Sequence, residues 1–180
     1  VIGCCGAVLL GRMSDIVDYL LYVDKKTGLP NREKLNIYIG EMAGKVLPEA
    51  FTCFTLSLDN LSELTKRFGY TVGDGVLKDF AGLVQLMGDT EGMRGYNGIG
   101  RFVVFFEECS SKKAAAMIRI LDNQVEEYNS LNPEYPIRYT AAWATTEETD
   151  TYEIRELLRL SQKKWKQMEK EKKDKTEEET

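Results

Sequence analysis

The chain alternates between short runs with the two-residue period of β-strands and longer runs with the spacing of amphipathic helices. In residues 51–58, FTCFTLSL, apolar and polar side chains alternate from Phe54 onward, and this pattern predicts a strand. The apolar runs FVVFF at 102–106 and IRYTAAWA at 137–144 predict two further strands. Between residues 92 and 100, four glycines predict a loop that leads into the strand at 102.

The longer runs carry apolar residues three and four positions apart, which is the spacing of one buried helix face. Asn31 follows the turn sequence TGLP and is a suitable N-cap for the helix that carries Leu35 to Met42. Strands that alternate with helices predict an α+β or α/β domain whose sheet is covered by helices. The predicted helices cover residues 14–22, 35–42, 61–68, a stretch from 76, 112–129 and a stretch from about 151.

The two ends of the chain differ from the middle. Residues 1–23 are predicted to form an N-terminal connector helix, and the first residue, Val1, indicates a piece of a longer chain. The opening VIGCCGAVLLG is too short to span a bilayer, so two interpretations stay open: the cytoplasmic end of a truncated transmembrane helix, or the apolar face of a helix that pairs with a partner. Residues 169–180 alternate in charge, and we expect a solvated, disordered tail there.

Composition and charge exclude several classes of function. The formal net charge of −5 argues against a nucleic-acid partner, because neutralising phosphates requires a basic face. The 180 residues include no histidine, which removes imidazole acid/base chemistry and imidazole metal sites. Cys4, Cys5, Cys53 and Cys109 have neither metal-site nor disulfide-framework spacing, which favours a reducing cytoplasm.

Three sequence blocks occur in an informative order: DKKTGLPNREKL at 24–35, LSLDNLSELTKRFGYTVGDGVL at 56–77 and NGIGRFVVFF at 97–106. Together they resemble the entry motif, the D-x-D block and the signature hairpin of GGDEF domains, the diguanylate cyclase family. Lys26 stands where the family usually has a leucine. The resemblance covers residues 24–168, which we take as the domain.

The resemblance implies an α+β fold like the palm of nucleotidyl cyclases, with a central, mostly antiparallel sheet flanked by helices. It also implies the family reaction, in which two GTP molecules on the two subunits of a dimer condense to cyclic di-GMP with divalent metals. Metal-assisted phosphoryl transfer needs hard oxygen ligands, so the residues at the family's acidic positions decide whether the reaction is expected.

By the same resemblance, the acidic positions of the family have lost their acids. The first metal aspartate falls on Ser57, and the two acidic signature positions fall on Gly100 and Arg101, whose cation repels Mg²⁺. We therefore expect no catalytic residue and no metal site, and Mg²⁺ only if residual cyclase activity survives on Asp59. The signature positions are Gly98, Ile99, Gly100, Arg101 and Phe102.

Guanine recognition is implied to be half retained. The family's base-reading asparagine falls on Thr65 and its partner aspartate on Asp74, whose carboxylate can accept hydrogen bonds from guanine. The alternative is that Asp74 only closes a turn and caps the following helix. The product-inhibition motif R-x-x-D falls on DTEG at 89–92 and lacks both charged residues. The candidate nucleotide-binding residues are Asp74, Thr65, Asp59 and Arg101.

The sequence thus predicts a degenerate GGDEF domain of a bacterial signalling protein, without cyclase activity, that acts as a regulatory or protein-interaction module. Its partner would be another protein or a second copy bound through the N-terminal helix. A sensor of GTP or GDP and a weak diguanylate cyclase are the alternatives. We expect a cytoplasmic domain, with membrane attachment through a missing N-terminal region as one option. Lys170, Lys172 and Lys173 would approach phosphate or form a solvated helix face.

Overall fold

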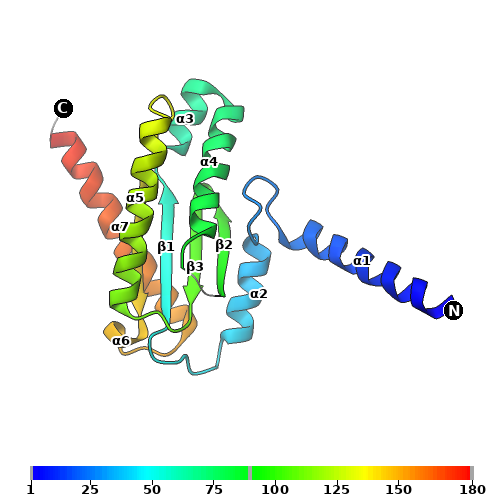
Figure 1. Cartoon of the computed structure of the whole chain (residues 1–180). Helices are drawn as coiled ribbons and strands as arrows, with labels where there is room; N and C mark the ends of the chain where they lie inside the picture. Colours follow the sequence, from blue (N-terminus) through cyan, green and yellow to red (C-terminus); the bar gives the residue numbers. More distant parts are fainter. Residues whose placement is uncertain (1, 89–90, 179–180) are drawn as a thin grey trace.

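A four-stranded antiparallel sheet forms the centre of the molecule in the computed structural model, which describes residues 2–88 and 91–178 (Figure 1). The strands lie in the order β2-β3-β1-β4, so the first strand of the sequence is central and the last is at an edge. Every neighbouring pair is antiparallel. The strands are β1 (Thr52–Leu58), β2 (Gly92–Gly98), β3 (Arg101–Phe106) and β4 (Tyr139–Thr145).

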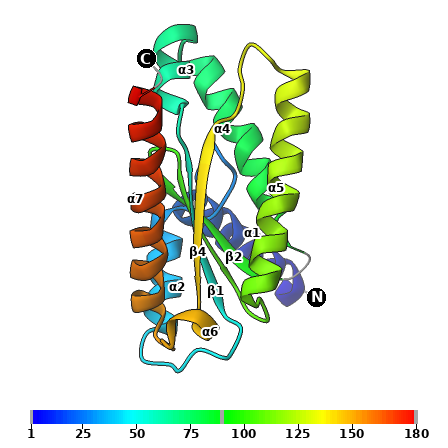
Figure 2. The same ribbon diagram turned by 90° about the vertical axis from the view of Figure 1, so that its left-hand side faces the viewer.

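Helices cover both faces of the sheet. Helices α4 and α5 lie on one face, and α7 lies on the opposite face together with α2 (Figure 2). Helix α1 extends away from the sheet (Figure 1). The helices are α1 (Ile2–Tyr22), α2 (Arg32–Met42), α3 (Leu61–Phe68), α4 (Tyr70–Gln85), α5 (Ser111–Leu131), α6 (Thr146–Thr149) and α7 (Ile154–Glu178).

The two inner strands are buried on both faces and therefore serve two core layers. Because successive side chains of a strand point to opposite faces, Phe102, Val104 and Phe106 of β3 enter the layer under α4 and α5. Val103 and Phe105 enter the layer under α2 and α7. This double burial explains why FVVFF is a continuous apolar run rather than an alternating one.

The predicted α+β fold with a mostly antiparallel sheet is confirmed, but β2 and the start of α4 differ clearly from the sequence prediction. The glycine-rich stretch expected to be a loop contains strand β2. At Gly95, a Cβ atom would lie 2.2 Å from the Leu35 side chain, so glycine is required because α2 packs directly on the strand backbone. Helix α4 begins at Tyr70, six residues before the expected start at Val76, and the GYTVGDG sequence forms its first turns.

The ends of the domain also differ from expectation. Helix α7 continues to Glu178 through most of the expected tail, and side-chain pairs four residues apart support it there: Gln167 with Glu171 and Lys173 with Glu169. Residues 179 and 180 of the predicted tail lie outside the described residues.

Asn31 caps α2 as predicted, accepting a hydrogen bond from the Lys34 backbone N–H at 3.1 Å. In the described ranges, no helix has the length and apolar character needed to cross a membrane.

Candidate functional site

The signature positions form the tight turn between β2 and β3. Gly98, Ile99 and Gly100 all have positive φ, at 85°, 53° and 69°, a region that glycine tolerates and a β-branched residue does not. The backbone of Gly100 is held on both sides, because its N–H donates to the Tyr96 hydroxyl at 3.1 Å and its carbonyl accepts from the Leu58 N–H at 2.8 Å. The turn therefore remains closely docked on β1 although Ile99 strains it.

Arg101 and Ser57 lie opposite each other on neighbouring strands, where the family resemblance places two acidic residues. The Arg101 guanidinium lies over the Trp165 ring, 4.9 Å from its centroid. The indole N–H of Trp165 donates to Ser57 Oγ at 2.9 Å. Trp165 comes from α7 and is 4% exposed, so an aromatic side chain fills the space beside both positions.

Asp59 is the carboxylate that remains near these positions, and the protein itself supplies its partners. It accepts hydrogen bonds from Ser57 Oγ at 2.5 Å and from Thr140 Oγ1 at 2.6 Å. Lys172 Nζ lies 3.8 Å from its Oδ2. The same ammonium donates to Thr140 Oγ1 at 2.9 Å and to the Tyr139 carbonyl at 2.7 Å.

The direction of these hydrogen bonds follows from the donor inventory. An indole N–H and an ammonium can only donate, so the Ser57 hydroxyl accepts from Trp165 and the Thr140 hydroxyl accepts from Lys172. Each hydroxyl then has its single proton left for Asp59. The result is a polar cluster of Ser57, Asp59, Thr140, Trp165 and Lys172, which we call the Asp59 cluster.

The Asp59 cluster does not fit Mg²⁺. This ion prefers octahedral oxygen ligands with one or more free carboxylates, whereas Asp59 here accepts two hydrogen bonds and lies beside an ammonium. Arg101, directly across the strand pair from Ser57, adds a second positive charge. Within residues 2–88 and 91–178, no group of three histidine, cysteine, aspartate or glutamate side chains is arranged to hold a metal ion.

Asp74, the other retained carboxylate, also faces a lysine of the same chain. Lys26 Nζ lies 2.8 Å from Asp74 Oδ1, and this hydrogen bond raises the pKa of Lys26 above its ordinary value. Both side chains are largely exposed. Asp74 lies inside α4, whose N-cap is Gly69, so the interpretation of Asp74 as a helix cap is wrong.

Thr65 packs against α4. A Cβ atom at Gly73 would lie 2.3 Å from Thr65 Oγ1, so the threonine hydroxyl occupies the space that the missing side chain of Gly73 leaves. Helices α3 and α4 approach each other closely at this point. In the sequence, this contact is indicated by Gly73, the glycine directly before Asp74.

The four candidate nucleotide-binding residues are divided among separate places. Asp59 and Thr65 line one cavity of about 360 Å³ beside the turn, and Arg101 lines a smaller one of about 130 Å³ with Trp165 and Lys166. Asp74 lines neither cavity. The full lining of the larger cavity is Leu58, Asp59, Leu61, Ser62, Thr65, Lys66, Tyr70 and Ile99. Of the product-inhibition positions, Asp89 and Thr90 lie outside the described residues.

Three residues of the Asp59 cluster were not predicted as site residues. In the sequence, Lys172 is one of three lysines with the same two interpretations, and Trp165 and Thr140 carry no signal beyond their places in a predicted helix and a predicted strand. They come from β4 and α7: Thr140 lies 81 residues from Asp59 and Trp165 lies 108 residues from Ser57, with Lys172 farther along α7.

Comparison with known proteins identifies the family of this domain. The family model "Diguanylate cyclase, GGDEF domain" matches residues 21–175, which include the sheet, the turn and most of α7. The chain belongs to the GGDEF domain family. The match begins three residues before and ends seven residues after the expected domain of 24–168. No curated protein sequence matches the chain.

Several solved GGDEF structures share the fold of this domain. A diguanylate cyclase/phosphodiesterase from Caldicellulosiruptor saccharolyticus superposes with a TM-score of 0.68 at 18% identity, covering 86% of this chain and 91% of that one. The coiled coil and GGDEF domain of DgcB from Caulobacter crescentus, in complex with c-di-GMP, gives 0.63 at 16% identity, with coverage of 79% and 78%. At these identities the likeness shows the fold alone.

A third neighbour is a multidomain protein. The S helix-GGDEF-EAL structure of LapD from Vibrio cholerae, bound to c-di-GMP, gives a TM-score of 0.63 at 12% identity. The match covers 76% of this chain but 32% of the LapD chain, so it concerns the GGDEF portion of a longer arrangement.

Proposed function

We propose that this GGDEF domain does not synthesise cyclic di-GMP and acts as a regulatory or protein-interaction module of a bacterial signalling protein. The observation that carries the proposal is the Asp59 cluster. Its carboxylate accepts two hydrogen bonds from hydroxyls and lies beside the Lys172 ammonium, while Arg101 and Ser57, which the resemblance places at acidic positions of the family, lie opposite each other. Binding of Mg²⁺ there would have to displace an internal cation and both hydrogen bonds.

The proposal is tested by product analysis. The purified chain is incubated with GTP and either Mg²⁺ or Mn²⁺, and the products are separated and identified by mass spectrometry, with an active diguanylate cyclase domain treated in parallel. We expect no cyclic di-GMP above the no-enzyme background. Accumulation of several molecules of cyclic di-GMP per protein would establish the weak-cyclase alternative, and loss of that product in Asp59→Asn would assign it to the Asp59 cluster.

A second candidate function is nucleotide sensing without metal. It is favoured by the cavity of about 360 Å³ beside the turn, which contains apolar walls together with Asp59, Ser62 and Lys66. Calorimetry with GTP and GDP, first with Mg²⁺ and then with a chelator, tests it. Metal-independent binding that is weakened by Lys66→Ala would favour the sensor, whereas absence of heat in both conditions would leave the interaction module.

A further inference from the structure

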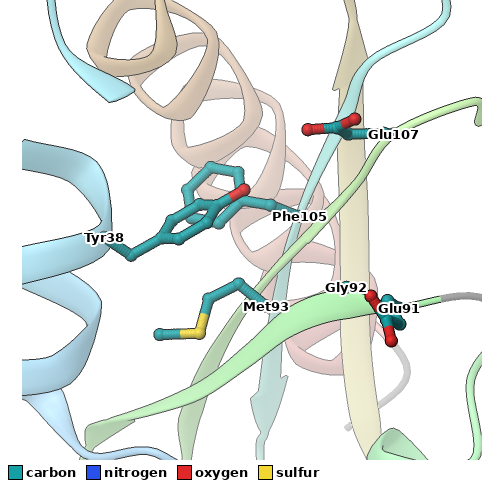
Figure 3. A pocket seen from close by; sticks show the side chains of 6 residues that line it. All are labelled: Tyr38, Glu91, Gly92, Met93, Phe105 and Glu107. Atoms are coloured by element: carbon teal, nitrogen blue, oxygen red, sulfur yellow. The ribbon is translucent and has the colours of Figure 1, made fainter. Parts of the chain in front are cut away.

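A different cavity, of about 440 Å³, lies between α2 and the ends of β2 and β3, away from the turn and the Asp59 cluster. Figure 3 shows the Tyr38 and Phe105 rings beside each other within it, with Glu107 on one side and Met93 and Glu91 on the other. The centroids of the two rings are 5.4 Å apart. The cavity is lined by Tyr38, Glu91, Gly92, Met93, Phe105 and Glu107.

The lining combines aromatic and thioether groups with negative charge and contains no basic residue. Glu91 and Glu107 are exposed, and neither has an ion-pair partner in the part of the chain that the structure describes. This distinguishes them from Asp59 and Asp74, which both face a lysine of the chain itself. Burial and the nearby charge of Glu107 raise the pKa of Tyr38 to about 12, so its hydroxyl stays protonated and neutral.

We propose that this cavity binds a lysine or arginine side chain of a partner protein. The partly exposed Tyr38 ring, which packs on the fully buried Phe105, and the Met93 thioether can hold the apolar stem. The Tyr38 ring can also attract the cation, and the two carboxylates at the rim can pair with the charged end. The same negative rim repels phosphate groups, which separates this cavity from a nucleotide site. The proposal rests on the proposed role as an interaction module and names the chemistry of the partner.

Synthetic tripeptides test the proposal on the intact chain. The probes are acetylated and amidated Ala-Lys-Ala and Ala-Arg-Ala, with the neutral Ala-norleucine-Ala as an isosteric control and spermidine as a small polyamine. Binding is followed by the backbone amide signals of Met93 and Phe105 in two-dimensional NMR spectra. Glu107→Gln is compared with Glu41→Gln, which removes the same charge from an exposed position on α2 that does not line the cavity.

We expect saturable shifts of the Met93 and Phe105 signals with both basic peptides and none with the norleucine peptide. Affinity should fall by about threefold in Glu107→Gln and stay unchanged in Glu41→Gln. Equal shifts with the norleucine peptide, equal losses in both variants, or no saturable shift would overturn the proposal. Tighter binding of spermidine than of either peptide would also overturn it and assign the cavity to a polyamine. None of these outcomes depends on GTP turnover, so they are distinguishable from failure of the proposed function.

Discussion

The two carboxylates that the resemblance places at family site positions, Asp59 and Asp74, both face a lysine from a distant part of the chain, yet their surroundings differ. The Asp74–Lys26 pair has the shorter distance, 2.8 Å, but both side chains are largely exposed, at 40% and 54%. The Asp59–Lys172 distance is 3.8 Å, while the Asp59 side chain is 27% exposed and also accepts hydrogen bonds from two hydroxyls.

The comparison teaches that a short ion-pair distance is a poor measure of how firmly a carboxylate is held. An exposed pair competes with water and loses side-chain entropy, so it contributes little. A partly buried carboxylate whose partners are themselves positioned by other groups is held by the whole cluster. Asp59 is therefore part of the folded architecture, whereas the Asp74 carboxylate can exchange Lys26 for another donor.

We expect the largest effect on the free energy of unfolding from removing the Trp165 ring of the Asp59 cluster. Trp165→Ala removes a 4%-exposed indole, the donor to Ser57 and the surface under Arg101. We expect a loss of about 3 kcal/mol or more in the free energy of unfolding, measured by urea denaturation. Met168→Ala on the same helix, where the side chain is 40% exposed, should cost less than about 1 kcal/mol. Equal losses in the two variants would show that Trp165 acts only as part of α7.

A direct test compares alanine substitutions of the two carboxylates. Asp59→Ala leaves the Ser57 and Thr140 hydroxyls without their acceptor and removes the negative charge beside Lys172, so we expect a loss of about 2 kcal/mol in the free energy of unfolding. Asp74→Ala should leave that free energy unchanged within error, because its pair is exposed. If Asp74→Ala destabilised the protein as much as Asp59→Ala, the distinction between the two sites would be wrong.

The sequence predicted the strands and the turn around Asp59, but not the side chains that contact it. Strands β1 and β3 were predictable because their apolar patterns are local and strong, and the turn was predictable from its glycines. Strand β2 was missed because its glycines, of which Gly95 makes room for α2, remove the alternation that identifies a strand.

The partners of Asp59 could not be derived from sequence spacing. Trp165 is 108 residues from Ser57 and Thr140 is 81 residues from Asp59, and only the pairing of β4 with β1 and the packing of α7 bring them together. Lys172 lies in a run of mixed charges, where solvent exposure is the ordinary expectation. The resemblance of the sequence placed family acidic positions at Ser57 and Arg101, but the cluster around them is a tertiary feature.

A third, smaller effect tests whether the turn beside the Asp59 cluster is optimised for stability. Ile99 has a φ of 53° and is 89% exposed, so the side chain strains the backbone and buries little apolar surface. We expect Ile99→Gly to raise the free energy of unfolding by about 0.5 to 1 kcal/mol, as measured by thermal and urea denaturation. Ile120→Gly, at an exposed helical position in α5, should instead destabilise by about 1 kcal/mol. A loss of stability in Ile99→Gly would instead show that the isoleucine side chain packs against other residues that line the cavity of about 360 Å³.

The smallest expected effect is the response of the two ion pairs to salt. Double-mutant cycles of Asp74→Ala with Lys26→Met and of Asp59→Ala with Lys172→Met measure the coupling within each pair. Raising NaCl to about 1 M shortens the screening length to roughly 3 Å, so the coupling of the exposed Asp74 pair should vanish. The Asp59 coupling should largely persist, because Lys172 also acts through the Thr140 hydroxyl, which salt does not screen. Loss of both couplings at the same salt concentration would mean that the Asp59 carboxylate is as accessible to solvent ions as the Asp74 carboxylate. Mg²⁺ could then reach Asp59 as readily as it reaches Asp74.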